Sequence, residues 1–479
     1  MKHYTITLFL LISRAFFFCS GPVERQDPAT LVAEEITTGN FSAARQLAEQ
    51  YRKATAGDTL LLCALDSLVD LTRRISLDFS LTEEQIRERV ATVMGPFTDD
   101  EFRKWEEDGD VEWRLIDGEK RYFNRAATNL KRILEHRRHK AEPEMMGDPD
   151  GFTTFKRDFA VATIADSGSY GLPVAPVNMK VTYTLTVDAD AVPPGETIRC
   201  WMPWPREGHS RQQEVTLLSA FPGEYTIAPR EVMQRSVYME QPAVAGEPAR
   251  FEVVFTYRSC GQYYDQATLA GTPRADPGAM QEFLGEQAPH ILFTPMVKKL
   301  SETIVGDAGD PLEIVRRIFT WIDEEIPWAG ALEYGTIPNI PEYVISRRHG
   351  DCGMKTMLFM TLARDNGIPT KWQSGWMMHP GEVNLHDWCE VWFAGTGWVP
   401  LDMSFGRLPG ENPRIREFYM TGIDPWRLIV NDDLATPFVP AKNHLRSEPY
   451  DFQRGEVEWR LGNLYFDQWD YHMDVQYLP

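Results

Sequence analysis

The strongest constraint on the fold is a change in the period of the apolar residues near residue 150. Over residues 27–147 they recur at the three- and four-residue spacing of an amphipathic helix, as in Leu60, Leu61, Ala64, Leu65 and Leu68. Over residues 150–270 they alternate with polar residues, the period of a half-buried strand, as in Val181, Tyr183, Leu185 and Val187. The sequence therefore predicts a mainly helical domain over 27–147 and an antiparallel β-sandwich over 150–270.

Two further segments bear on this division. Trp201-Met202-Pro203-Trp204-Pro205 contains prolines, which cannot donate to a strand ladder, so we expect an edge strand or a loop there. Residues 426–479 form an acidic, aromatic C-terminal tail, in which GEVEWRL (455–461) nearly repeats GDVEWRL (109–115). Both copies are predicted strands, and Asp117-Gly118 after the first is a hairpin turn signal.

The first 21 residues have the pattern of an export signal. A basic start precedes an apolar run from Ile6 to Ile12, and a polar, proline-containing stretch follows Gly21. Arg14 interrupts the apolar segment, and no other stretch reaches the roughly 18 apolar residues of a membrane span, so we expect no transmembrane helix. Cys19 is a candidate lipid anchor, although three phenylalanines stand where a lipoprotein signal usually has small residues. Lipidation therefore stays open.

Charge and cysteine content exclude several classes of function. A net charge of −21 and a pI of about 5.0 argue against a nucleic-acid partner, which normally meets a basic surface. Six cysteines in 479 residues are too few for a disulfide scaffold. Cys200 and Cys260, at strand ends of the β-domain, are the pair to test for a disulfide.

One cysteine stands at the start of a predicted helix within residues 285–425. Asp351 is a candidate N-cap for the segment that begins at Cys352, and Gly367 ends that segment. Unpaired N–H groups in the first turn of a helix favour a thiolate, the species that attacks a carbonyl. The Asp351 carboxylate opposes that charge, so a histidinium would have to outweigh it.

Two predicted strands downstream carry a histidine and an aspartate. In NLHDWCEVWF (384–393), His386 shares a face with Trp388, whereas Asp387 lies on the other face. In GWVPLDM (397–403), Asp402 can orient His386 only in one register. A three-residue loop over 394–396, with positive φ at Gly397, pairs Asp402 with Trp388 and leaves His386 within reach. A two-residue loop would put Asp402 on the wrong face.

Cys352, His386 and Asp402 together have the nucleophile, base and orienter logic of a catalytic triad. GDCGMKTMLFMTLARDNGIPTK, LHDWCEVWF and GWVPLDMSFG resemble the three motifs of the transglutaminase-like superfamily. The motifs lie within about 310–406, and a β-domain followed by this core is similar to the layout of secreted bacterial members. The resemblance implies a papain-like α+β core in a multidomain α+β protein.

The resemblance also implies the chemistry. Cys352 would attack a peptide or protein amide, His386 would exchange the proton, Asp402 would hold the imidazole, and water or an amine would resolve the thioester. The backbone N–H of Cys352 is a natural oxyanion donor, and Trp328 or Tyr334 is a candidate second donor.

Several questions stay open at the level of sequence. Trp376 and Trp388 are candidates for a substrate groove, and half-buried strand packing is the alternative. We expect no cofactor and no metal, because ligand-type residues lack workable spacing. An exported enzyme of the bacterial periplasm, the outer membrane or the medium competes with a non-catalytic envelope-binding scaffold. The sequence gives neither the substrate, nor the oligomeric state, nor whether the tail covers the site.

Overall fold

The computed structural model describes residues 27–55, 57–141 and 151–479. The expected signal over residues 1–21, including Cys19, lies outside the described residues. The chain divides into two compact units. One contains the described residues up to Glu135 together with Thr336–Pro338, and the other contains His136–Gly335 and Asn339–Pro479, apart from the undescribed segment 142–150. Among the described residues, none of the helices combines the length and apolar character needed to cross a bilayer.

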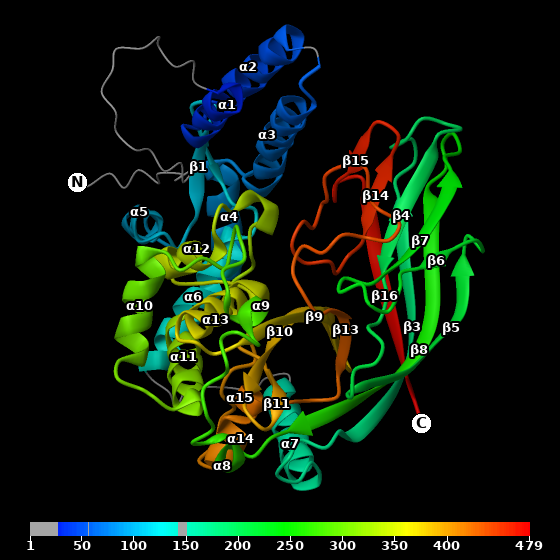
Figure 1. Cartoon of the computed structure of the whole chain (residues 1–479). Helices are drawn as coiled ribbons and strands as arrows, with labels where there is room; N and C mark the ends of the chain where they lie inside the picture. The colour runs from blue at the N-terminus through cyan, green and yellow to red at the C-terminus, as the bar shows by residue number, and fades with distance from the viewer. Residues whose placement is uncertain (1–26, 56, 142–150) are drawn as a thin grey trace. The chain divides into compact units, whose positions relative to one another are not determined.

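The N-terminal region is mainly helical, as the period of its apolar residues predicts (Figure 1). Thr82 and Gln85 form the reciprocal side-chain to backbone bonds of a capping box. Ile116 pairs with Glu119, so Asp117 and Gly118 make the expected two-residue turn, both with positive φ. Its elements are α1 (Pro28–Thr37), α2 (Phe41–Ala54), α3 (Thr59–Asp78), α4 (Glu83–Met94), α5 (Asp99–Asp108), β1 (Trp113–Ile116), β2 (Glu119–Tyr122) and α6 (Ala126–Ala141).

Antiparallel sheets follow one further helix, α7 (Phe152–Asp166). One sheet has the strand order β12-β8-β3-β16, with β5 also on β8, and the other has the order β15-β14-β4-β7-β6. The strands before the core are β3 (Val174–Val187), β4 (Thr197–Pro203), β5 (Gln212–Phe221), β6 (Thr226–Ile227), β7 (Ser236–Pro242) and β8 (Ala249–Tyr263).

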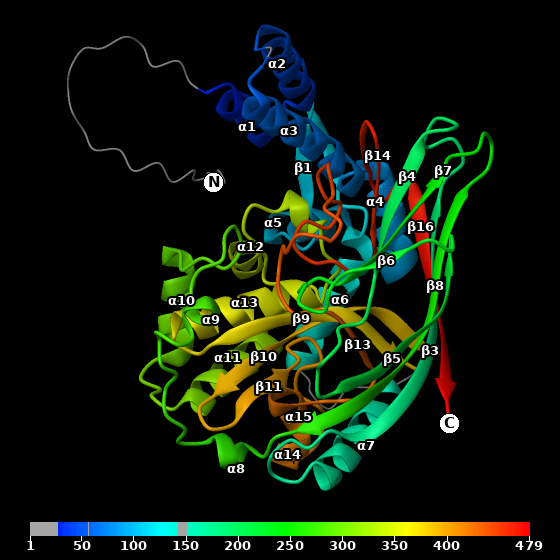
Figure 2. The ribbon, with the colours of Figure 1, turned by 45° about the vertical axis from the view of Figure 1, so that its right-hand side comes forward.

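The C-terminal tail is part of these sheets and not a separate appendage. It supplies β14 (Glu456–Trp459), β15 (Gly462–Leu464) and β16 (Trp469–Leu478). In both ribbon views the red strand β16 runs beside β3, and the two strands pair along almost their whole length (Figure 2). Strand β14 pairs with β4, so the second copy of the repeated heptapeptide is a strand, as predicted.

Two expectations for the β-domain are wrong. Strand β4, which contains Trp201 and Met202, lies between β14 and β7, so this part of the segment is neither an edge strand nor a loop, whereas Trp204 and Pro205 follow the strand in a loop. Its pairing with β14 stops at Trp201, so Pro203 falls beyond the last residue bonded on that side. Cys200 and Cys260 are free buried thiols on strands of different sheets, and they form no disulfide with each other.

A sheet of strand order β11-β10-β9-β13 forms the core, with α13 packed on β9 and β10. The elements of this region are α8 (Gln266–Leu269), α9 (Gln281–Leu284), α10 (Pro295–Val305), α11 (Pro311–Glu325), the 3-10 helix η2 (Tyr334–Thr336), α12 (Ile340–Arg347), α13 (Cys352–Asp365), β9 (Thr370–His379), β10 (Glu382–Phe393), β11 (Gly397–Leu401), α14 (Pro413–Arg416), α15 (Phe418–Thr421), β12 (Gly422–Ile423) and β13 (Arg427–Asn431).

The β-domain and the core share one hydrophobic interior. Trp201 and Phe255 from the sandwich belong to the same buried cluster as Trp376 on β9 and Leu428 on β13. Burying aromatic side chains supplies much of the free energy that favours the folded state, so this shared cluster joins the two regions. The core sheet is therefore held in place by the sandwich that precedes it and by the tail that completes that sandwich.

Candidate active site

Cys352 lies in the first turn of α13, where the sequence predicts it. Asp351 is the N-cap, and its Oδ1 accepts a hydrogen bond from the backbone N–H of Met354 at 3.0 Å. Gly367, with φ +72°, ends the helix as expected. The helix is buried along almost its whole length, and Cys352 itself is 8% exposed.

His386 and Asp402 meet through the register that the catalytic hypothesis requires. Phe393 pairs with Gly397, so the loop covers residues 394–396, and Gly397 has φ +97°. Continuing this register past β11 puts Asp402 opposite Trp388. His386 Nε2 then donates to Asp402 Oδ2 at 2.7 Å, and both side chains are buried. Nδ1 is the ring nitrogen that remains to accept a proton.

Asp402 is held as a carboxylate. Its Oδ1 accepts hydrogen bonds from the backbone N–H groups of Ser404 and Phe405 at 2.9 and 3.0 Å. Burial opposes ionisation, but His386 and the Arg427 guanidinium outweigh it and lower the pKa of Asp402 to about 2. A permanently charged orienter favours the tautomer of His386 that carries its proton on Nε2.

The thiol of Cys352 contacts a different carboxyl group. Its Sγ donates to Asp387 Oδ2 at 3.2 Å, and within the described part of the chain no hydrogen bond joins Sγ to His386. Burial, then Asp387 and Asp351, raises the pKa of Cys352 well above its ordinary value. Burial, then Asp451 and Asp351, raises the pKa of Asp387 as well.

The pKa shifts of the thiol and of the imidazole act in the same sense. Burial lowers the pKa of His386 although Asp402 acts in the opposite direction. A raised thiol pKa and a lowered imidazole pKa both favour a neutral pair over a thiolate and an imidazolium.

The two candidate oxyanion donors lie close to the nucleophile in different ways. Trp328 forms a parallel β-bridge with Gly350, two residues before Cys352, and is 36% exposed. Tyr334 directs its hydroxyl to Asp351 Oδ1 at 2.6 Å. The Tyr334 proton therefore serves the helix N-cap in this structure.

Trp376 and Trp388 are both buried, and each indole N–H has an internal acceptor. Trp376 donates to the backbone oxygen of Gln453 at 3.1 Å, and Trp388 donates to Gln373 Oε1 at 2.7 Å. The Trp388 ring also lies against the His386 imidazole. Their burial and these contacts give both side chains a packing role next to His386 and its strand.

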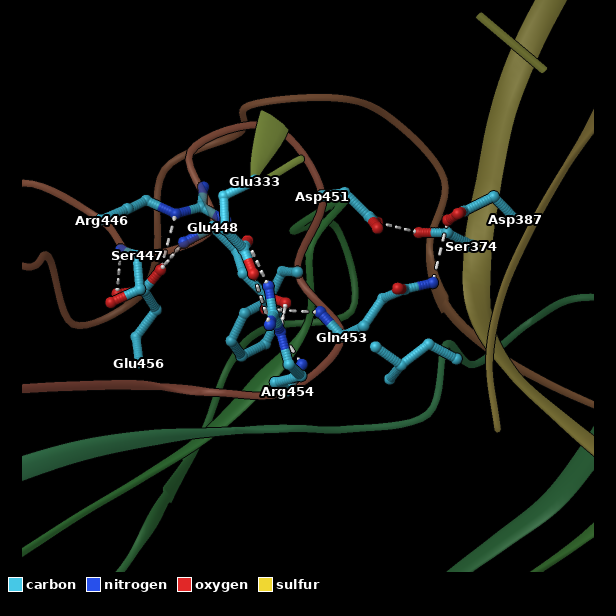
Figure 3. Close-up of polar contacts among 12 residues, drawn as sticks. Glu333, Ser374, Asp387, Arg446, Ser447, Glu448, Asp451, Gln453, Arg454 and Glu456 are labelled. Carbon is cyan, nitrogen blue, oxygen red and sulfur yellow. Dashed lines mark hydrogen bonds and ion pairs between the residues drawn. The ribbon is translucent and has the colours of Figure 1, made fainter. Parts of the chain in front are cut away.

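The tail supplies residues that bind the site directly. Gln453 Nε2 lies within hydrogen-bond distance of three oxygens, His386 O and Asp387 Oδ1 at 2.9 Å and Gly375 O at 3.0 Å. Figure 3 shows Gln453 reaching from the tail loop toward Asp387, beside the contact between Asp451 and Ser374. Through Gln453 and Asp451 the tail thus packs against the strands β9 and β10, which carry Ser374, His386 and Asp387.

Ion pairs between Arg454 and two glutamates hold the tail loop in place and form a clamp. Arg454 Nε binds Glu448 Oε1 at 2.6 Å, and its other nitrogens bind the Glu333 carboxylate at 2.8 and 3.1 Å (Figure 3). A bidentate arginine–carboxylate pair fixes orientation as well as distance. Glu333 precedes Tyr334, so the clamp joins the loop to the segment that supports the N-terminus of α13.

Sequence reasoning missed Asp387, Arg427 and Gln453. Strand alternation assigned Asp387 to the face away from His386, and Arg427 and Gln453 fall outside the three motifs. A local signal exists for one neighbour: at Gly353 an added Cβ would lie 2.1 Å from Tyr334 Oη and 2.7 Å from Asp387 Oδ2. The glycine after the cysteine therefore marks a crowded contact, which includes the missed carboxyl group.

The comparisons with known proteins agree with the motifs. Residues 298–403 match the family model of the transglutaminase-like superfamily, so the chain carries a transglutaminase-like domain, as predicted. No curated protein matches the chain.

Solved structures with similarity include a candidate cysteine protease from Cytophaga hutchinsonii, 14% identical, covering 64% of this chain and 93% of that one, with a TM-score of 0.43. The periplasmic domain of TgpA from Pseudomonas aeruginosa is also 14% identical over 52% of this chain and 91% of that one, with a TM-score of 0.26.

Proposed function

We propose that the protein is a thiol-dependent acyl-transferase or hydrolase that acts on amide bonds of peptides or proteins. The observation that carries the proposal is the buried hydrogen bond from His386 to Asp402, together with Cys352 at the start of α13, whose thiol donates to Asp387, the residue after His386. The transglutaminase-like match covers all three of these residues. The imidazole keeps Nδ1 for the thiol proton because Nε2 is bonded to Asp402.

The reaction follows from these groups. The Cys352 thiol leaves Asp387 and passes its proton to His386 Nδ1 as sulfur attacks the amide carbon. The oxyanion that forms accepts a hydrogen bond from the backbone N–H of Cys352. The imidazolium then protonates the departing amine, and a thioester remains on Cys352. Water or a second amine, deprotonated by His386, releases the acyl group and restores the thiol.

The experiment is turnover of glutamine-containing peptides, followed by ammonia release and by mass spectrometry of cleaved or amine-linked products. We expect Cys352→Ala to abolish every product, and the exposed Cys63→Ser to retain them. Turnover that survives Cys352→Ala would refute a thiol mechanism. Products that contain the added amine would identify an amine as the acceptor, and free carboxyl groups, as glutamate or a cleaved peptide, would identify water.

A non-catalytic scaffold is the second candidate, and burial favours it, because Cys352 is 8% exposed and His386 is 3% exposed. The two functions differ in thiol reactivity. If iodoacetamide alkylates Cys352 no faster than the buried Cys389 and no peptide turns over, the scaffold is the better description. Binding of a partner that is unaffected by Cys352→Ala would then support it.

We further propose export, from the pattern of residues 1–21. Cell fractionation of the full chain and of a variant that lacks these residues tests this proposal. Retention of both proteins in the cytoplasm would refute it. Radiolabelled fatty-acid incorporation that depends on Cys19 distinguishes a lipid anchor from a cleaved signal.

A further inference from the structure

Arg427, the first residue of β13, lies at the centre of a buried chain of charges behind the proposed triad. Its Nη2 binds Asp402 Oδ2 at 2.9 Å and Asp424 Oδ2 at 2.8 Å. Asp424 continues the chain, because its Oδ1 lies 3.1 Å from His379 Nε2 and its Oδ2 accepts from Tyr419 at 3.0 Å. Arg427, Asp402 and Asp424 are each no more than 1% exposed.

The guanidinium is fixed by packing as well as by charge. Its central carbon lies 4.4 Å from the centre of the Phe405 ring and 5.5 Å from that of Trp388. Both rings also contact the His386 imidazole. Arg427 and His386 are therefore held by the same aromatic side chains, and Asp402 Oδ2 accepts a bond from each of them.

We propose that Arg427 is a positioning residue for the reaction proposed above. Its guanidinium fixes the Asp402 carboxylate against His386 and, by sharing that carboxylate's negative charge, keeps the imidazole a neutral base. Without Arg427, Asp402 Oδ2 would accept a hydrogen bond from His386 alone. The carboxylate would then stabilise the protonated imidazole more strongly.

The electrostatics of the site agree with this role. Burial lowers the pKa of His386, Asp402 acts to raise it, and Arg427 and His379 lower it further. Both carboxylates have depressed pKa values despite burial, and Arg427 contributes to each depression. Because Arg427 acts on the pKa of His386, the pH at which His386 titrates reports on the role of Arg427.

Other charged groups around His386 come from several elements. His379 faces it from β9, and Asp387 is its neighbour on β10. Lys355 and Cys352 lie on α13, where Lys355 interacts with Asp402. Lys156 on α7 acts on His379. Arg427 differs from the other cations because it binds the Asp402 oxygen that His386 uses.

The test is an NMR titration of His386 in the full chain labelled at histidine nitrogen, with the signal assigned by His386→Gln. Arg427→Met removes the charge, and we expect His386 to titrate at higher pH than in the wild-type protein. Arg427→Lys retains the charge, and we expect a titration close to that of the wild type. Arg206→Met is the matched control, because Arg206 is a buried arginine that binds Asp432 at 2.8 Å.

Kinetics supply the second readout. We expect Arg427→Met to lower kcat on the order of 10²-fold, the scale of a misplacement of about 1 Å, with KM little changed. Arg427 is fully buried behind Asp402, so it has no surface with which to bind substrate. In the pH dependence of kcat/KM, the limb that reports the ionisation of His386 should move to higher pH, by the same shift as in the NMR titration.

Two further variants keep the inference testable if Arg427→Met does not fold. Asp424→Asn combined with Arg427→Met removes one buried charge of each sign, and an upward shift smaller than that of Arg427→Met is expected. Asp424→Asn alone leaves Arg427 to Asp402, so His386 should titrate at lower pH. If Arg427→Met folds, alone or together with Asp424→Asn, and His386 still titrates as in the wild type, the inference is overturned.

The outcomes separate this inference from the proposed function. The NMR titration needs no turnover, so it also applies to the inactive Cys352→Ala protein. If His386 shifts in the Arg427 variant but the wild-type protein turns over no amide, the role of Arg427 is supported and the proposed enzyme activity is refuted. Amide turnover that depends on Cys352 together with an unshifted His386 would retain the enzyme and refute the role of Arg427.

Discussion

Replacing Gln453 by methionine tests whether the tail is a structural part of the site. Gln453 is 4% exposed, and its carboxamide nitrogen lies within 3.0 Å of His386 O, Asp387 Oδ1 and Gly375 O. Methionine has a similar length and volume but no donor. The substitution therefore removes the hydrogen bonds and leaves the packing nearly unchanged.

The expected loss of stability follows from the number of N–H donors that Gln453→Met removes. The amide group has two N–H donors for three oxygens, so about two full hydrogen bonds are lost. Each lost bond that leaves a buried acceptor unsatisfied costs about 1–3 kcal/mol. Neighbouring groups can relax around the methionine and recover part of this energy. We therefore expect the free energy of unfolding to fall by about 2–4 kcal/mol.

Urea denaturation followed by circular dichroism measures this change. The matched control is Gln213→Met, because the Gln213 amide donates to Ser210 O at 2.8 Å on the exposed surface of β5. An exposed substitution of this kind changes stability by about 0.5 kcal/mol or less. If Gln453→Met is no more destabilising than Gln213→Met, the tail does not hold the site through this residue.

Three further predictions address the nucleophile, its helix and the response to acid. Asp387→Asn puts an amide nitrogen where the carboxyl oxygen accepts from the Cys352 thiol, with the remaining oxygen kept toward Gln453, so alkylation at pH 7 should become about fivefold faster for a bond worth about 1 kcal/mol; an unchanged rate relative to Cys63, measured by mass spectrometry, contradicts this. Gly353→Ala should lower the melting temperature, because the contacts with Tyr334 and Asp387 cost about 1–3 kcal/mol against a gain of about 1 kcal/mol in helix propensity; an equal or higher melting temperature excludes the crowding. Burial lowers the pKa of His290 to about 3, below the ~6.5 of an unfolded histidine, so the unfolded chain takes the proton first and stability should fall as the pH drops from about 6.5 toward 3. His290→Asn should flatten that slope in denaturation curves taken across this range, and an unchanged slope would assign it to other groups.

The loop between β10 and β11 shows what the sequence could predict. The orientation of Asp402 depends on a period of two and on the length of one turn, and both are local properties. Gly397 supplies the positive φ that the longer loop needs, so the register could be chosen before the partners were known. The capping box at Thr82 and the turn at Asp117-Gly118 were predictable for the same reason.

The errors arise where a partner comes from a distant part of the sequence. Trp201 was assigned to an edge or a loop because of Pro203, and only the position of β14 shows that pairing on that side stops before the proline. The tail could not be assigned to the sandwich, because the register of β16 on β3 joins residues almost 300 positions apart. Gln453 and Arg427 reach the site through the same long-range pairing and packing.

The distribution of these residues makes the β-domain part of the proposed catalytic apparatus. The family match ends at residue 403 and contains the triad, but Arg427 on β13 and Gln453 in the tail lie beyond it. Strand β13 pairs with β9 and buries Leu428 in the interior shared with the sandwich, and the tail enters the same interior through Leu464 and Trp469. The charge of Asp402 and the orientation of Asp387 are thus set by residues whose positions depend on the sandwich. A fragment limited to residues 298–403 would retain all three motifs but lose the groups that hold two of the carboxyl groups in place, so motif retention alone does not define a working site in this chain.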